Sequence, residues 1–310
     1  VSAMLSRVNI LVMCSAILWA SAFAVCPDNW KQENCLGSSG NLGKGVVVEP
    51  YTQEKIVWEK NLQSHSHYTI NPSTTALFVI DPQEVYSKCP EKLSVEDLVK
   101  SPTAEDFKGH SPLCCEQFFE AVANQNKIAA AARSRNMPVF VHAHVYRDFS
   151  DDGKPTNCGR LCDFDILGWS GWPEAWNLWN AALPWHKPVF APETPGGFEA
   201  DTQRDFYCEK SVFSGMTDKV VNKLIEQKID TIIVTGFMTQ YCSVTTSRHA
   251  HDLGFKVIFV QDANDGPMLQ QFVTGTDENH LVPFYLGIAV ADVTSTEEVL
   301  KQLELPDGEL

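Results

Sequence analysis

Apolar residues occur along the chain in short continuous runs that are separated by longer amphipathic stretches. Continuous runs are typical of parallel strands buried on both faces, whereas apolar residues three and four apart mark one face of a helix. Strands are predicted at residues 75–81, 138–144, 231–235, 256–260 and 287–292. Helices are predicted at residues 117–136, 216–228, 240–253, 267–281 and 295–303. This alternation predicts one large α/β domain.

The other elements are organised around residues 229–265, which read as strand, turn, helix and strand. Such a unit implies two parallel strands joined by a right-handed crossover. Cys242 falls in the first turn of the predicted helix, just beyond the carboxyl end of a strand, where open α/β sheets bind their ligands. The positive end of the helix dipole favours thiolate at that position. Cys242 is therefore a candidate nucleophile, and the alternative is a buried structural cysteine.

Other polar residues stand at the ends of predicted elements. Asp81 closes the first strand, so its carboxylate is expected over the same crevice, unless it only caps a turn. His142 and His144 lie on one face of the next strand, which makes them either metal-ligand candidates or packed, pocket-lining histidines. No further histidine or carboxylate stands at a recognised ligand spacing, so we predict no metal and no cofactor. Lys210 stands just before a predicted helix, and a lone lysine is usually solvated.

Two segments differ in composition from the predicted core, which occupies residues 71–310. Residues 25–70 are polar and show little periodicity, so we expect an N-terminal extension on the domain surface. Residues 145–205 form a long insertion rich in tryptophan and containing Cys158 and Cys162. Its indoles either pack the insertion onto the domain or act as a lid that lines the entrance to the site.

Residues 1–24 have the pattern of a secretory signal. A basic residue precedes an apolar core, and Ala22-Phe23-Ala24 provides the small residues of a cleavage site. The apolar core is short for a membrane span, and an uncleaved anchor is the alternative. We therefore expect a secreted or secretory-pathway protein that has no contact with the membrane once the signal is removed.

Net charge and cysteine content further restrict the class of protein to which the chain can belong. The formal net charge of −15 argues against a nucleic-acid partner. Of ten cysteines, Cys14 lies in the signal, and the odd number that remains indicates one free thiol in an exported protein. If Cys242 is the free thiol, the other eight are compatible with four disulfides, of which Cys26–Cys35 and Cys158–Cys162 are two possible pairs.

Three stretches together resemble the isochorismatase-like cysteine hydrolases, a family that includes nicotinamidase, N-carbamoylsarcosine amidase and isochorismatase. They are FVIDPQ at 78–83, EKSVFSG at 209–215 and TGFMTQYCSVTTSRHAHDLGFKVIFVQDA at 235–263. The resemblance covers most of residues 74–304. It implies a Rossmann-like three-layer α/β/α fold with a mainly parallel sheet, a small-molecule substrate and a homo-oligomer. It also identifies Asp81, Lys210 and Cys242 with the family's catalytic aspartate, lysine and cysteine.

The chemistry of this triad is consistent with the residue types. A free thiol is only slightly ionised at neutral pH, so it needs a base and a nearby cation. Asp81 can accept the thiol proton and Lys210 can stabilise negative charge. By the same resemblance, the backbone amides of Met238 and Cys242 form the oxyanion hole, and the peptide bond between Phe237 and Met238 is cis.

The sequence also departs from parts of the family. VHAHVYRD lacks the Asp-x-His…His metal motif of nicotinamidases, which puts zinc and nicotinamide in doubt. Retention of Cys242 favours cleavage of a C–N bond in a small amide or ureido substrate. The alternatives are a vinyl-ether hydrolase with Asp81 as the acid, and an inactive secreted binding protein on the same fold. The candidates for the pocket wall are His144, Trp169, Trp172 and Phe213.

Overall fold

The fold is an α/β sheet structure in which every strand pairing is parallel. The computed structural model describes residues 29–36, 68–87, 89, 114–144, 190, 194–267 and 278–304 of the chain. In this part of the chain the strands form one sheet, in the order β1-β4-β3-β2-β5-β6-β7. Their bounds are β1 Cys35–Leu36, β2 Thr75–Ile80, β3 Val139–His144, β4 Phe206–Lys210, β5 Thr231–Phe237, β6 Lys256–Asp265 and β7 Asp292–Thr294.

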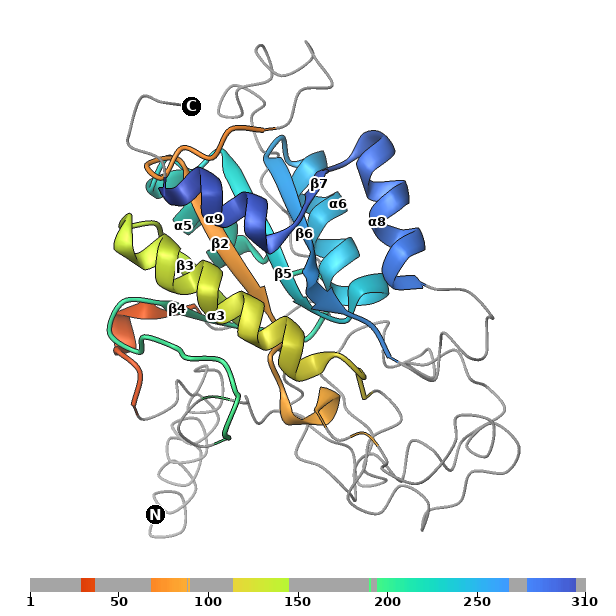
Figure 1. The fold of residues 1–310 in the computed structure, drawn as a ribbon. Helices are drawn as coiled ribbons and strands as arrows, with labels where there is room; N and C mark the ends of the chain where they lie inside the picture. The colour runs from red at the N-terminus through yellow and green to blue at the C-terminus, as the bar shows by residue number, and fades with distance from the viewer. Residues whose placement is uncertain are drawn as a thin grey trace, which may run out of the picture.

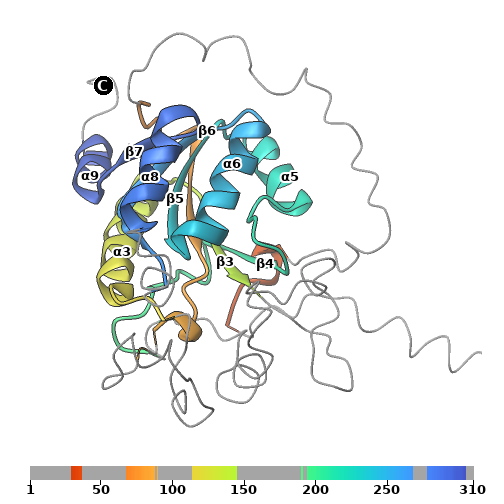
Figure 2. The ribbon, with the colours of Figure 1, turned by 90° about the vertical axis from the view of Figure 1, so that its right-hand side faces the viewer.

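Helices cover both faces of this sheet. The α-helices are α3 Phe118–Ser134, α5 Asp218–Glu226, α6 Val244–Asp252, α8 Glu278–Ala289 and α9 Thr296–Glu304, and a π-helical turn, η6 Thr239–Ser243, joins β5 to α6. Figure 1 and Figure 2 show α3 and α9 on one face and α5, α6 and α8 on the other. The predicted three-layer α/β/α fold is therefore confirmed. No helix in the described ranges is both long enough and apolar enough to cross a membrane.

Alternation along the strands divides the core into two layers. Leu77 and Val79 of β2 pack in the cluster that contains Ile128 of α3. Phe78 and Ile80 pack in the opposite cluster, which contains Leu224 of α5. Since successive side chains of a strand point to opposite faces, a strand between two helical layers must be apolar at every position. This requirement explains the continuous apolar runs in the sequence.

Gly236 allows β5 to approach β2 where the two strands end. It pairs with Ile80, has a φ of 126°, and a β carbon built on it would overlap the carbonyl oxygen of Ile80. Backbone at that φ is strained for any other residue. The carbonyl oxygen of Ile80 is a main-chain atom, so it cannot rotate away from a β carbon. A glycine is therefore required just before the turn that carries Cys242.

We expect the Gly236→Ala substitution to lower the free energy of unfolding by about 3 kcal/mol or more, through combined strain and overlap. Gly287→Ala is the matched control, because Gly287 is exposed on α8 and its β carbon would meet only Val293 at 3.5 Å. That change should be neutral or stabilise by up to about 1 kcal/mol. Urea unfolding of the two variants measures both effects. Equal stability of both would show that β5 does not approach β2 this closely.

Two predictions near the C-terminus are wrong in position. Residues 287–292 are not a strand: α8 continues to Ala289, and the amides of Val290 and Ala291 both donate to Leu286 O at 2.8 and 2.9 Å, which ends the helix. The strand β7 follows at Asp292–Thr294. The prediction failed because a short apolar run is compatible with both the helical and the strand period. The helix predicted at 267–281 is instead α8, which begins at Glu278; residues 268–277 lie outside the described part.

The N-terminal extension is more than a surface segment. Cys35–Leu36 forms β1 at the edge of the sheet beside β4, and Trp30 and Ile70 are buried in the core. Trp30 packs against Phe190 and Tyr207, with ring centroids 5.9 and 5.2 Å apart. A strand of two residues is too short to leave a periodic signal in the sequence.

The cysteine assignment also needs correction. Cys89 and Cys114 form a disulfide, and Cys35 is also disulfide-bonded. Cys115, Cys208 and Cys242 are buried cysteines that form no disulfide, so the expectation of four disulfides and a single cysteine outside them is wrong. Cys208 occupies a core position of β4, where a cysteine acts as a small apolar residue.

Candidate active site

Four chemically reactive side chains meet at the carboxyl edge of the sheet. Asp81 directly follows β2, His144 and Lys210 are the last residues of β3 and β4, and Cys242 lies in η6 directly after β5. Because the strands are parallel, their carboxyl ends lie at one edge. The chain leaves β2 toward β3 on one side, whereas β5 lies on the other side. This is the switch point at which open α/β sheets bind ligands.

The direction of each side chain follows from the two-residue period of the strands. Phe140 lies four residues before His144, on the same face of β3. It packs with Phe206 and Cys208 of β4 in the layer toward α5 and α6. His144 and Lys210 continue these rows, and they are register partners. Their side chains therefore enter the same layer as Cys242.

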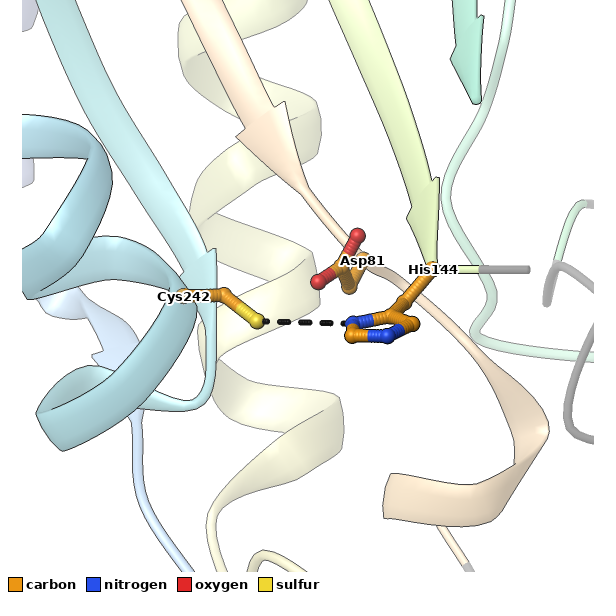
Figure 3. Close-up of side chains that lie close together, drawn as sticks. All are labelled: Asp81, His144 and Cys242. Atoms are coloured by element: carbon orange, nitrogen blue, oxygen red, sulfur yellow. Dashed lines mark hydrogen bonds between the residues drawn. The ribbon is translucent and has the colours of Figure 1, made fainter. Parts of the chain in front are cut away.

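Lys210 lies at the centre of the cluster. Its Nζ forms an ion pair with Asp81 Oδ2 at 2.6 Å and donates to Cys242 Sγ at 3.2 Å. It also donates to His144 Nδ1 at 3.4 Å and to Val212 O at 3.3 Å. Figure 3 shows Asp81 and His144 directed toward the sulfur of Cys242, with His144 Nδ1 at 3.9 Å from it. The three residues predicted as the triad thus lie together in space.

The Asp81–Lys210 pair is completely buried. Burial raises the pKa of Asp81, although the Lys210 charge opposes the shift. Burial alone would lower the pKa of Lys210, but the interactions of its ammonium with Asp81 and Cys242, the ion pair with Asp81 foremost, outweigh burial and the pKa is raised. An ion pair without access to water keeps both charges only through their mutual attraction, so each partner depends on the other.

Cys242 and His144 are neutral in the resting site. Burial raises the pKa of the Cys242 thiol to about 12, against the lowering effect of Lys210. Burial and the Lys210 charge both lower the pKa of His144 well below its usual value. The sequence-based expectation of a thiolate favoured by the helix dipole therefore does not describe this state, because Cys242 is buried and the desolvation outweighs the dipole.

Asp81, His144 and Cys242 could in principle hold a metal ion, because one ligand atom from each lies within 4.8 Å of the others. However, the ammonium of Lys210 already lies within 3.4 Å of an atom of each. A metal ion would have to displace this cation. The residues therefore fit a lysine-centred cluster, and we assign no step to a metal.

Sequence reasoning missed Gln83, which follows Asp81 by two residues. Its side-chain amide donates to His144 O at 2.9 Å and accepts from His144 N at 2.8 Å. Gln83 thereby acts as an additional strand residue that fixes the end of β3 to the segment after β2. The available signal was a glutamine that closely follows a predicted core strand and its terminal carboxylate.

The remaining predicted site residues are only partly placed. The peptide bond between Phe237 and Met238 is cis, in agreement with what the resemblance implies. Phe213 is half-buried, with its ring 6.3 Å from that of His144 and 5.6 Å from that of Tyr241. Trp169 and Trp172 lie outside the described residues. Met238 is buried, and its carbonyl accepts from the amides of Tyr241 and Ser243 in the π turn.

A cavity of about 460 Å³ occurs elsewhere, at the opposite edge of the sheet. Its lining includes Pro138 and Ile229, which precede β3 and β5, together with Arg133 and Asp205. Arg133 and Asp205 are already paired to each other at 2.6 Å. No cysteine is among the residues that line this cavity, and we assign the site by its chemistry rather than by cavity size.

A buried cysteine beside a paired aspartate and lysine at the switch point of an α/β sheet provides the groups that a cysteine hydrolase needs. Residues 75–280 match the family model of the isochorismatase domain. The chain therefore belongs to the isochorismatase family, and it is a hydrolase.

The chain is similar to several individual proteins. YecD, an uncharacterized isochorismatase family protein of Escherichia coli O157:H7, is 27% identical over 236 residues, or 76% of this chain and 98% of that protein. The crystal structure of a cysteine hydrolase from Pseudomonas syringae pv. phaseolicola 1448A covers 78% of this chain and 98% of its own, with 21% identity and a TM-score of 0.52. An isochorismatase family protein of Burkholderia thailandensis covers 77% of this chain and 100% of its own, with 19% identity and a TM-score of 0.47.

Proposed function

We propose that this hydrolase cleaves a C–N bond in a small amide or ureido compound through a thioester on Cys242. The observation that carries the proposal is the position of the Cys242 sulfur. It lies 3.2 Å from the Lys210 ammonium and within 4.8 Å of the Asp81 carboxylate. A vinyl-ether hydrolysis would need only the acid, and it leaves the nearby thiol without a role.

Acylation begins from a neutral thiol. As the sulfur forms a bond to the substrate carbonyl carbon, its proton moves to Asp81. The carbonyl oxygen becomes an oxyanion, which the backbone amides of Met238 and Cys242 are proposed to stabilise. Asp81 then gives the proton to the substrate nitrogen and the C–N bond breaks. The amine departs, and the acyl group remains on Cys242 as a thioester.

Deacylation repeats these steps with water as the nucleophile. Asp81 accepts a proton from water while the oxygen attacks the thioester carbonyl. Collapse of the tetrahedral intermediate breaks the C–S bond, and Asp81 returns its proton to the sulfur. The acid product leaves and the neutral thiol is restored, so atoms and protons balance over one turnover.

The electrostatics of the resting site suit this route. A thiol with a pKa of about 12 does not ionise in advance, so proton transfer must accompany attack on the substrate. The raised pKa of Asp81 makes its carboxylate a stronger base than an exposed aspartate. Lys210 stays charged throughout because its pKa is also raised.

The experiment is a screen of small amides, ureas and isochorismate, followed by an acid quench and intact-mass measurement of the protein. We expect a substrate with a C–N bond to add the mass of its acyl group, located on the peptide that contains Cys242. Turnover of isochorismate that survives replacement of Cys242 would instead establish the vinyl-ether route. A protein that turns over no compound and whose Cys242 is not labelled by iodoacetamide would favour a binding role.

A further inference from the structure

The buried ammonium of Lys210 has more acceptors than protons. It carries three N–H groups, whereas four acceptor atoms lie within 3.4 Å: Asp81 Oδ2, Cys242 Sγ, Val212 O and His144 Nδ1. The backbone carbonyl accepts equally well in every state of the reaction, and Asp81 is an ionised carboxylate both in the resting enzyme and in the acyl-enzyme. The sulfur differs, because thiolate is a good acceptor whereas a thiol or a thioester is a poor one. Whether the third N–H donates to the sulfur or to the imidazole therefore depends on whether the sulfur is a thiolate, a thiol or a thioester.

His144 is held in the form that this exchange requires. An ammonium group cannot accept a hydrogen bond, so the Nδ1 that it faces must carry the lone pair of a neutral ring. Protonation would place a second positive charge beside Lys210 in a buried site, which is unfavourable. The two hydrogen bonds from Gln83 fix the main chain of His144. Figure 3 shows the ring turned toward the sulfur from the end of β3.

We propose that His144 is a positioning residue that accepts the third N–H of Lys210 whenever the sulfur of Cys242 is neutral, as thiol or thioester, and gives it up when thiolate forms. The proposal extends the function proposed above to a fourth residue. Without His144 the ammonium would keep one N–H without a good acceptor in the resting enzyme and in the acyl-enzyme. His144 thus stabilises the neutral-sulfur states relative to thiolate.

The pH dependence of thiol reactivity follows from this competition. Among the described residues, the titratable groups facing Cys242 are Asp81, His144 and Lys210, from the ends of β2, β3 and β4. Asp81 and burial raise the pKa of Cys242, and Lys210 lowers it. If the competing acceptor at His144 is removed, the third N–H of Lys210 donates to the sulfur instead. This hydrogen bond stabilises thiolate, so the pKa of Cys242 should fall.

The test is the rate of iodoacetamide labelling of Cys242 between about pH 6 and 9, where the thiolate fraction rises about tenfold per pH unit. We expect His144→Leu to increase the rate at every pH, by about tenfold for each unit by which the thiol pKa falls. His144→Asn places Oδ1 near the position of Nδ1, so it should restore the slow rate of the wild type. His249→Leu is the matched control, since His249 lies seven residues after Cys242, contacts Ser214 at 2.9 Å and should leave the rate unchanged.

An unchanged or slower rate in His144→Leu would overturn the proposal, as would equal acceleration by the leucine and asparagine variants. A second measurement needs no substitution: ¹⁵N NMR of the wild-type imidazole should show Nδ1 without a proton. A protonated Nδ1 contradicts the proposal even if His144→Leu fails to fold. Neither readout uses a substrate, so either can fail while C–N cleavage through Cys242 stands.

Discussion

Replacement of Cys242 by alanine is expected to lower kcat by about 10⁴-fold or more for any C–N substrate of this protein, because no acyl-enzyme can form. The fold should tolerate the change. Cys242 is buried beside apolar residues of the layer toward α6, and its loss removes one sulfur and leaves the Asp81–Lys210 pair intact. The measurement is steady-state kinetics of the best substrate from the screen, with thermal unfolding to show that the variant is folded.

Two further buried thiols provide controls within the same chain. Cys208 lies in β4, two residues from Lys210, and its Sγ lies 3.6 Å from Phe206 O. Cys115 lies beside the Cys89–Cys114 disulfide. Burial raises the pKa of both thiols well above the usual value, and for Cys115 the charge of Asp265 adds to this rise. Cys208→Ala and Cys115→Ala should therefore keep kcat within a few fold; an equal loss in all three would show that packing, not nucleophilic attack, explains the effect.

The sequence is sufficient to predict Asp81 and Cys242 because each follows a mainly apolar strand that is buried at every position. β2 and β5 have no exposed residue, so their ends are marked by the first polar or small residue after the run. Parallel pairing then places both ends at one edge. These steps require only local pattern and the handedness of the crossover.

Lys210 and His144 are harder to predict from pattern alone. β4 reads FYCEK, yet all five residues are buried, and Lys210 could be linked to the site only through the resemblance to a family. A charged residue at the end of a buried strand looks like a solvated one until its partner is known. His144 was open to several interpretations because the acceptor role depends on a lysine 66 residues away.

The protonation state of the site could not be inferred from local structure. A cysteine at a helix start is expected to be acidic, and that rule holds where the thiol has access to water. Here η6 is a π turn that begins directly after β5 and carries Cys242 into the core, so desolvation dominates. Burial depth depends on how β5, α6 and the loop after β4 pack together, and this information is spread over the whole sheet.

Asp81→Asn separates the charge of the carboxylate from its geometry. Asp81 has a φ of 49°, a left-handed conformation that asparagine tolerates about as well as aspartate, so the backbone should not change. We expect kcat/KM to fall by about 10²- to 10⁴-fold through loss of the general base. The variant should also lose about 3–5 kcal/mol of stability, because it leaves the fully buried Lys210 ammonium without its counter-charge.

The activity of the wild type and the stability of Asp81→Asn should each change with pH in a definite direction. The carboxylate is the active form of Asp81 and its pKa is raised, so the activity of the wild type should fall on the acid side with a midpoint above the ordinary value of about 3.9. This limb should be absent in Asp81→Asn. In the variant, burial is expected to lower the pKa of Lys210 below its unfolded value. Folding then favours the neutral amine, so the variant's stability should rise with pH toward about 10.4.

Asp205→Asn is the matched control for Asp81→Asn. Asp205 is as deeply buried and is paired with Arg133 at 2.6 Å, but it precedes β4, whereas Lys210 ends it. The control variant should lose stability while the acid limb of kcat/KM stays in place. Chemical denaturation and pH–rate profiles of both variants distinguish the two roles. If Asp81→Asn kept its acid limb, or lost no more activity than Asp205→Asn, then the carboxylate at the end of β2 would be a structural partner of Lys210 and not the base.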